Sequence, residues 1–272
     1  MTLPHSPTAS RLCTSGPLAV VAALEAELRA VLAHLPDAQV ITAAGRAYWC
    51  GHLHGHAVVA VLSRIGKVAA ATTTTALLER FNARAVLFTG AAGGLADGVR
   101  VGDLVVAEAL LQHDMDASPL FPRHEVPLYG RSRFATDLNL RSALSSACAS
   151  VLADAPRLLG DAATAEFRIH APALHQGLIV SGDRFVSTSV ESGSLRAELP
   201  DALAVEMEGA AVAQVCTDYG IAFAVVRVIS DRADDDAHSD FQRFIADVAS
   251  RYSAAIVAQL LRALPQVPTR AT

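Results

Sequence analysis

The chain has 272 residues, 52% hydrophobic and 18% charged, with a formal net charge of −5 at pH 7. This length and apolar content fit one large domain better than two small ones. The acidic balance and the dispersed Lys and Arg residues argue against a nucleic-acid partner. The four cysteines show no CxxC or ligand-like spacing, which is typical of reduced, packed thiols and of the cytoplasmic location we expect.

The two ends of the chain are expected to be loose. Residues 1–16 are rich in Ser, Thr and Pro, and the apolar stretch that follows is short before Glu25. That stretch is too short for a membrane span and lacks a good signal-cleavage context, so we expect no membrane partner. Residues 265–272 are expected to form a C-terminal tail. The domain is therefore predicted to run over 17–264.

Short apolar runs alternate along the chain with segments of helical character. The predicted strands are 18–23, 57–62, 84–89, 103–107, 177–180, 202–206 and 222–229. The predicted helices are 25–35, 67–81, 137–153, 207–219 and 240–262. Continuous apolar runs are what strands covered on both faces require. We therefore expect the α/β class, as a single-domain three-layer α/β/α sandwich around a mixed, largely parallel sheet.

Three other segments have distinctive compositions. Residues 113–130 contain three prolines and are predicted to form a long loop, of a length that is often functional or interfacial. Residues 153–175 are rich in Ala and Pro. Gly90, Gly93 and Gly94 follow the strand 84–89 and allow close backbone approach, but their spacing is not GxGxxG. A dinucleotide site is therefore disfavoured.

Polar residues gather where several predicted strands end. Glu206 and Glu208 stand where an apolar run becomes an Ala-rich helical run, and Asp231 and Glu27 follow two other runs. Open α/β sheets bind ligands at the carboxyl ends of their strands. A carboxylate in apolar surroundings usually has a partner. The alternative is that Glu206 and Glu208 lie in a first helical turn, where the helix dipole favours anions.

Five segments carry a resemblance to a known family. They are VEMEG at 205–209, SGDRF at 181–185, VISD at 228–231, IGKVAA at 65–70 and TGAAGGL at 89–95. Together they resemble the 5′-methylthioadenosine/S-adenosylhomocysteine nucleosidases of the nucleoside phosphorylase superfamily. The resemblance runs in family order from about Leu18 to about Leu261, and 153–175 looks like an insertion. It implies a nucleoside phosphorylase-like fold and hydrolysis of an N-glycosidic bond to adenine, with no metal or organic cofactor.

Such a reaction passes through an oxocarbenium-like sugar, so the enzyme must protonate the leaving base, activate a water and hold the ribose. By resemblance, Asp231 is the general acid at adenine N7, although an Asp there could simply cap a loop. Glu27 matches the general base, which would hold the water with Arg227 and Glu208. Glu25, two residues earlier, should face elsewhere.

The resemblance also implies substrate contacts. Glu208 would accept hydrogen bonds from the ribose hydroxyls, and Met207 would pack against the sugar. Phe185 would stack on adenine, while the backbone of Val186 reads the edge of the base. Phe241 would close over the base, although both Phe241 and Met207 also suit a plain core role. The remaining expected site residues are Leu24, Ala91, Ala92, Gly93, Glu206 and Ser230.

Some positions depart from the family pattern. Leu24 stands where Met is common and Ala91 where Ser is common, so the preferred 5′ substituent stays open. Arg64 replaces a usual Gly, and Gln112 stands where an aromatic residue is common. Because the family's 5′ pocket borrows residues from a partner subunit, we expect a homodimer with 113–130 at its interface.

Three rival functions remain to be weighed. A phosphorylase of the same fold needs cationic groups around phosphate, and its relatives carry Arg where this chain has Phe88 and lack a counterpart of Glu27. Arg64 keeps that alternative open. A catalytically silent purine-binding module would have lost Glu27 or Asp231. An unrelated nucleotide-binding protein is disfavoured, because the chain has no P-loop, zinc-like cluster or GxSxG motif.

The histidines at 52, 54 and 56 have an i, i+2 spacing that suits a metal only on a strand. We interpret them instead as a solvated or edge-strand feature, and we expect no metal site.

Overall fold

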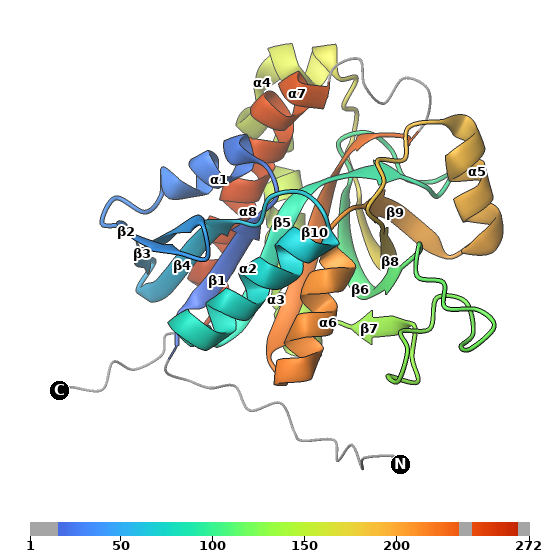
Figure 1. Cartoon of the computed structure of the whole chain (residues 1–272). Helices are drawn as coiled ribbons and strands as arrows, with labels where there is room; N and C mark the ends of the chain where they lie inside the picture. Colours follow the sequence, from blue (N-terminus) through green and yellow to red (C-terminus); the bar gives the residue numbers. More distant parts are fainter. Residues whose placement is uncertain (1–15, 234–240, 266–272) are drawn as a thin grey trace.

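The computed structural model describes residues 16–233 and 241–265, which form one ten-stranded mixed sheet with helices on both sides (Figure 1). The strands are β1 (Leu18–Ala22), β2 (Gln39–Ala43), β3 (Arg46–Leu53), β4 (His56–Leu62), β5 (Ala85–Gly94), β6 (Leu104–Gln112), β7 (Arg133–Ala135), β8 (Leu174–Ser181), β9 (Ala202–Glu206) and β10 (Ala222–Asp231). The helices are α1 (Glu25–Leu32), α2 (Lys67–Phe81), α3 (Leu138–Ala153), α4 (Ala155–Glu166), α5 (Ser189–Glu198), α6 (Gly209–Tyr219), α7 (Phe241–Phe244), the π-helix η1 (Ile245–Ala249) and α8 (Ser250–Ala263).

The sheet closes on itself, which corrects the expected three-layer sandwich. The strand order is β10-β6-β8-β9-β5-β1-β4-β3-β2, and β10 also pairs with β5, so that five strands form a closed ring. Of the ten strand pairings in the described residues, five are parallel and five antiparallel, so the sheet is mixed rather than largely parallel.

Closure depends on the glycine-rich end of β5. The first half of β5 pairs with β1, its residues from Ala85 to Gly93 pair with β10, and its last two residues, Gly93 and Gly94, pair with β9. A Cβ at Gly93 would lie 2.9 Å from the Cβ of Ala233 and 3.0 Å from an oxygen of Asp231. Only glycine allows β5 to bend this close to the end of β10.

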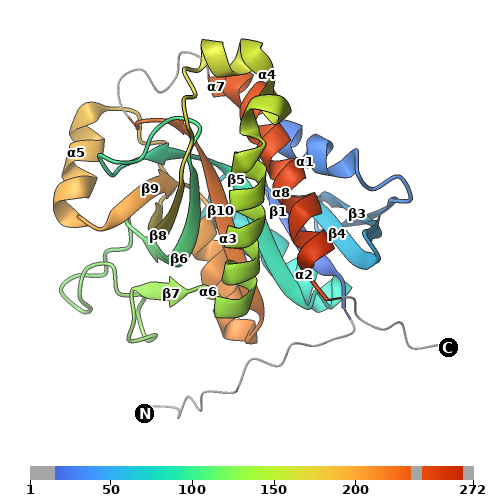
Figure 2. The ribbon, with the colours of Figure 1, turned by 180° about the vertical axis from the view of Figure 1, so that it is seen from behind.

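The helices cover both faces of the strands, as the continuous apolar runs predicted. Val20 of β1 belongs to a core cluster with residues of α1, α3 and α8. Its neighbour Val21 points the other way, into a second cluster with residues of α2 and α6. Figures 1 and 2 show these two helical groups from opposite sides. The strand ends therefore meet between two packed layers, where the polar side chains gather.

The C-terminal helical segment, from α7 through α8, packs in the core on the same side of the sheet as α1. Residues Phe241–Ala263 are long and apolar enough to cross a membrane by length and composition, but 72% of the most apolar window is buried inside the fold. That burial is typical of a core helix in a globular protein.

Residues 113–130 contain no helix, as predicted, whereas 153–175 contains α4. The predicted tails 1–16 and 265–272 lie outside the described residues apart from Gly16 and Pro265. Cys50, Cys148 and Cys216 are free thiols, and Cys13 lies outside the described residues.

The three histidines sit on and around the β3–β4 hairpin, which lies inside the terminal strand β2, so they are not on an edge strand. His52 is the exposed residue of β3 and pairs with Asp37, His54 is in the turn, and buried His56 begins β4. Among the described residues, no group of three or more His, Cys, Asp or Glu side chains is arranged to hold a metal ion.

Candidate active site

One cavity lies where β1, β5, β9 and β10 end. Thirteen of the fourteen predicted site residues line it, and the other, Arg227, is buried beside it. The lining residues are Ala23, Leu24, Glu27, Ile65, Ala91, Ala92, Gly93, Arg184, Phe185, Val186, Val205, Glu206, Met207, Glu208, Ser230, Asp231 and Phe241. Four lining residues were not predicted as site residues: Ala23, Ile65, Arg184 and Val205. Each of them adjoins a predicted site residue or lies in one of the five motifs.

Glu27 is a buried carboxylate with one free oxygen. It lies in the first turn of α1, where its Oε2 accepts a hydrogen bond from the N–H of Leu24 at 3.1 Å. Its Oε1 has no hydrogen-bond partner among the described residues, and the side chain is fully buried. Burial raises the pKa of Glu27 to about 7, against the opposing charge of Arg227. A carboxyl group with this pKa can accept a proton from water near neutral pH.

Glu25 points away from the cavity, as predicted from its spacing. It is exposed and forms an ion pair with Arg29 one turn along α1. Of the two acidic residues at the start of this helix, only Glu27 faces the cavity.

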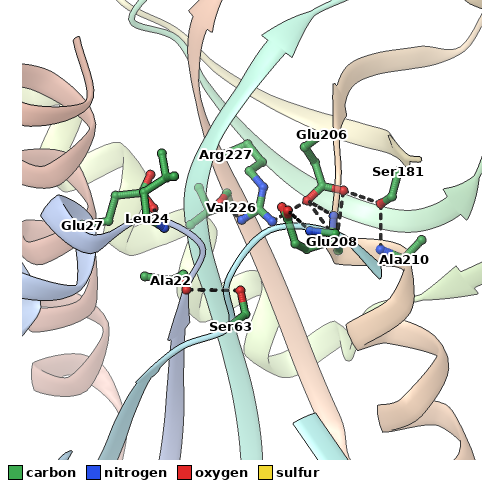
Figure 3. Close-up of polar contacts among 12 residues, drawn as sticks. Ala22, Leu24, Glu27, Ser63, Ser181, Glu206, Glu208, Ala210, Val226 and Arg227 are labelled. Carbon is green, nitrogen blue, oxygen red and sulfur yellow. Dashed lines mark hydrogen bonds and ion pairs between the residues drawn. The ribbon is translucent and has the colours of Figure 1, made fainter. Parts of the chain in front are cut away.

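Glu206, at the end of β9, has both oxygens occupied by protein donors (Figure 3). The hydroxyl of Ser181 donates to Oε1, and the N–H of Gly209 donates to both oxygens at 2.9 Å. Oε2 also accepts from Arg227 Nη2 at 2.6 Å and from the N–H of Glu208 at 3.2 Å. Glu206 lines the cavity as predicted, and both of its oxygens are already engaged by protein donors.

Arg227 links the two acidic sites. Its guanidinium lies 4.0 Å from the centre of the Phe88 ring and is only 1% exposed. A Cβ at Gly90 would lie 3.4 Å from Arg227 Nη1 and 3.4 Å from Glu27 Oε1. The absence of a side chain at Gly90 therefore lets this cation approach Glu27, while its other end holds Glu206.

Glu208 stands at the N-cap of α6 and is held from across the cavity. Its Oε1 accepts a hydrogen bond from the N–H of Gly66 at 2.8 Å. Gly66 has a φ of 96°, a conformation that favours glycine, so this donor depends on the residue type at 66. Burial, reinforced by the negative charge of Glu206, raises the pKa of Glu208.

Asp231 ends β10, where the pairing with β5 shifts register after Ile229. Its Oδ2 accepts from the Ser230 hydroxyl at 2.6 Å and its Oδ1 from the N–H of Ala233 at 2.8 Å. Asp231 adjoins Gly93, whereas Glu27 adjoins Gly90, and three residues of strand span about 10 Å. The two carboxyl groups thus lie at separate parts of the cavity, with room for a ligand between them.

Two aromatic rings meet on the cavity wall. Phe185 follows β8 and Phe241 begins α7, and their ring centroids are 6.0 Å apart at an interplanar angle of 78°. Phe185 is 40% exposed, while Val186 beside it is buried. The structure thus brings together the predicted stacking ring and the predicted aromatic cover.

Arg64 does not reach the cavity. It is exposed, has a φ of 68°, and its Nη2 donates to the carbonyl of Gly45 at 2.6 Å. It is absent from the cavity lining. The residue that kept a phosphate-binding site open therefore supplies no charge there.

Known proteins share this architecture. The family model of the phosphorylase superfamily matches residues 17–262. A structure of the 5′-methylthioadenosine/S-adenosylhomocysteine nucleosidase from Neisseria meningitidis, in complex with methylthio-immucillin-A, is 34% identical with a TM-score of 0.81, and the match covers 92% of this chain and 100% of that one. The chain belongs to the methylthioadenosine/adenosylhomocysteine nucleosidase family of the phosphorylase superfamily. It is therefore an N-ribosyl hydrolase.

Two further structures are similar to this nucleosidase. An S-adenosylhomocysteine nucleosidase from Streptococcus pyogenes, in complex with 5-methylthiotubericidin, is 32% identical with a TM-score of 0.79, over 92% of this chain and 98% of that one. A futalosine hydrolase of Helicobacter pylori is 30% identical with a TM-score of 0.78, over 92% of this chain and 98% of that one. The fold and family thus include nucleosidases with different named substrates.

Proposed function

We propose that this nucleosidase hydrolyses the N-glycosidic bond of 5′-methylthioadenosine, S-adenosylhomocysteine or a related adenosine derivative, releasing adenine and the free ribose derivative. The observation that carries the proposal is the buried Glu27 carboxylate, which has one free oxygen and faces the same cavity as Asp231. A base and an acid at separate parts of one cavity match the division of labour in hydrolysis with inversion.

Asp231 serves as the general acid on the base side. Its carboxyl group delivers a proton to adenine N7 and bonds the exocyclic amine, while Ser230 and the N–H of Ala233 hold it in place. Phe185 stacks on the purine, Phe241 covers it, and the backbone of Val186 reads its edge.

Glu27 serves as the general base on the sugar side. Its free Oε1 accepts a proton from a water molecule that Arg227 and Glu208 help to hold. Glu208 also accepts hydrogen bonds from ribose hydroxyls, and Met207 packs against the sugar. The walls around the sugar are lined by Leu24, Ala91, Ala92 and Gly93.

Water suits this site better than phosphate. An anionic nucleophile needs uncompensated positive charge, yet Arg227 is paired with Glu206 and Arg184 with Glu191. Arg64 lies outside the cavity lining. Ionised Glu27 would also repel phosphate at close range. The phosphorylase alternative is therefore the weaker one.

The oligomeric state and location belong to the same proposal. We expect a homodimer with 113–130 at its interface, which is supported by exposed apolar side chains there: Leu120 is 83% and Leu128 is 88% exposed. Val68 is 76% exposed and follows Lys67, which forms an ion pair with Asp114 of the same loop. Replacing Leu128 with Asp should convert a dimer to a monomer by light scattering. An unchanged mass would contradict the proposed interface.

The expected location of the enzyme is the cytoplasm.

The direct test is to incubate the enzyme with methylthioadenosine, adenosylhomocysteine, adenosine and futalosine, with and without added phosphate. Free adenine from the first two, at a rate independent of phosphate, supports the proposal. Futalosine belongs in the panel because a futalosine hydrolase is 30% identical to this chain. Faster cleavage of futalosine than of methylthioadenosine would replace the substrate proposed here. A strict requirement for phosphate would make the enzyme a phosphorylase.

A further inference from the structure

Residues 154–175 pack against two elements that carry site residues without entering the cavity. The segment contains α4, which is kinked at Gly160 (φ 77°, ψ 163°), and an extended connection into β8. None of these residues, all of which the structure describes, lines the cavity. The segment can therefore affect the active site only through the residues that it contacts.

Its first contact is with the helix that carries Phe241. The ring of Phe167 packs edge-on against Phe244, with centroids 5.2 Å apart and an interplanar angle of 86°. Glu166 forms an ion pair with Arg243 on the same helical turn. Figures 1 and 2 both show α4 lying beside α7.

Phe241 stands at the first position of a short helix, one turn before Phe244. The four-residue α7 continues directly into the π-helix η1 rather than into α-helix. A single π-turn is a weaker continuation than α-helix and often marks a functional position. The packing of Phe167 on Phe244 thus fixes the turn that places Phe241 on the cavity wall.

The second contact is with buried Asp103, which precedes β6. Asp103 Oδ1 accepts a hydrogen bond from the N–H of Ala173 at 2.8 Å, and its Oδ2 accepts from His175 Nε2 at 2.8 Å. The carbonyl of Asp103 accepts from the N–H of Ile229 at 2.9 Å, and the N–H of Gly102 donates to the carbonyl of Ile229 at 2.8 Å. Both polar groups of Ile229 are thus held by the loop that the segment fixes.

Ile229 is the last residue of β10 that pairs with β5 in the regular register, two residues before Asp231. The same loop is supported by Ile169, which leaves no room for a side chain at Gly102: a Cβ there would lie 2.8 Å from Ile169 Cγ2. A backbone shift at Ile229 would therefore move Asp231 relative to the rest of the cavity.

We propose that residues 154–175 position two parts of the active site through separate contacts: Phe167 places the aromatic cover Phe241, and His175 with Asp103 places the acid Asp231. The functional part of this inference rests on the roles proposed above for Phe241 and Asp231. Phe167, His175 and Asp103 are positioning residues, since none of them lines the cavity.

Two variants separate the contacts, and their effects should fall on different kinetic constants. Phe167→Ala should raise KM for methylthioadenosine by about three- to tenfold with little change in kcat, because it loosens a cover that binds the base. His175→Ala should lower kcat by about ten- to a hundredfold, because a small displacement of an acid slows proton transfer. His175→Gln, which keeps an N–H donor, should recover most of the loss. The control is Arg157→Ala, which removes an exposed ion pair with Asp154 on the same segment.

Hydrogen exchange tests the same contacts without any substrate. Phe167→Ala should accelerate exchange in 241–249 and His175→Ala in 226–233, whereas Arg157→Ala should do neither. The inference is overturned if exchange in these two stretches stays at the wild-type rate, or if Arg157→Ala has the same effects. If the wild type cleaves no adenosine derivative, the proposed function fails, but the exchange rates still decide whether 154–175 positions these two stretches.

Discussion

Two corners of the cavity hold buried carboxylates in different surroundings. At the β9–α6 corner, formed by Ser181 and Glu206–Gly209, the oxygens of Glu206 receive hydroxyl, amide and guanidinium donors. At the β1–α1 corner, formed by residues 24–27, Glu27 accepts one hydrogen bond and keeps one oxygen free. Both side chains are almost inaccessible to solvent.

The difference shows how partners decide what a buried carboxylate does. A carboxylate whose two oxygens are both engaged by protein donors, one of them the Arg227 guanidinium, stabilises the fold around it. At Glu27 burial outweighs the backbone hydrogen bonds and the charge of Arg227, and it raises the pKa to about 7. The contrast supports the proposed catalytic role of Glu27 and suggests a structural role for Glu206, although the sequence places both beside the ends of apolar strands.

The largest effect on kcat should come from replacing Asp231, the proposed general acid that acts together with Glu27. Asp231→Asn keeps the shape of the side chain but cannot deliver a proton, and general acid catalysis typically contributes about 10²–10⁴-fold. We expect a loss of kcat in that range with an unchanged melting temperature. A folded variant with near wild-type turnover on methylthioadenosine would remove Asp231 from the acid role.

The β9–α6 corner should respond in stability rather than in rate alone. Glu206→Gln leaves the buried guanidinium of Arg227 without its counter-charge, and breaking a buried ion pair from one side costs about 3–5 kcal/mol. Glu208→Gln is the matched control, because Gly66 N–H is its only recorded donor among the described residues. Urea unfolding of both variants should show a much larger loss for Glu206→Gln. Equal losses would contradict the assignment of structural work to Glu206.

At the β1–α1 corner, the free energy of unfolding should depend on pH. Because the folded pKa of Glu27 is raised from 4.5 to about 7, the native state binds this proton more tightly than the unfolded chain, and stability falls as pH rises between those values. The penalty amounts to about 3 kcal/mol above pH 7. Glu27→Gln should therefore gain stability relative to wild type as pH rises from 4.5 to 7. A constant difference over that range would show that the pKa of Glu27 is not raised.

The smallest effect concerns the choice of base. Asp231 accepts the exocyclic amine of adenine in the proposed complex, and a buried polar group left unpaired costs about 1–3 kcal/mol. Inosine analogues should therefore lose about tenfold or more in kcat/KM compared with adenosine analogues. Efficient cleavage of inosine would contradict the adenine assignment, and a phosphate requirement alongside it would favour the phosphorylase alternative.

Most of the cavity-lining residues could be predicted from the sequence, because they lie in short motifs at strand ends. The helix 67–81 was predicted with the bounds that α2 has in the structure. Strands β2 and β3 were missed, since Val40 and Ile41 are about half exposed and the apolar run there is short. The helices α4 and α5 were missed as well, because Pro156 and Gly160 in α4 and the Ser and Gly residues in α5 are typical of loops.

Closure of the sheet could not be predicted from local patterns. It depends on β10 pairing with β5 across a long stretch of sequence and on the bend at Gly93 and Gly94, neither of which changes hydrophobic periodicity. The hydrogen bonds to both oxygens of Glu206 could not be predicted either, because the donors Ser181 and Arg227 lie on strands distant in sequence. Arg64 shows the converse: its sequence position suggested a phosphate contact, but its backbone turns the side chain toward Gly45.

The most direct test of the contrast between the two corners is to measure hydrolysis and ligand binding together in Glu27→Gln. In the proposed mechanism Glu27 activates water at the sugar and does not touch the purine, so the variant should lose hydrolysis of methylthioadenosine by about 10²–10⁴-fold. Its dissociation constant for adenine, measured by calorimetry, should stay within about twofold of wild type, because Phe185, Val186 and Asp231 remain in place. Retained hydrolysis, or loss of adenine binding together with activity, would contradict the assignment of Glu27 as the base.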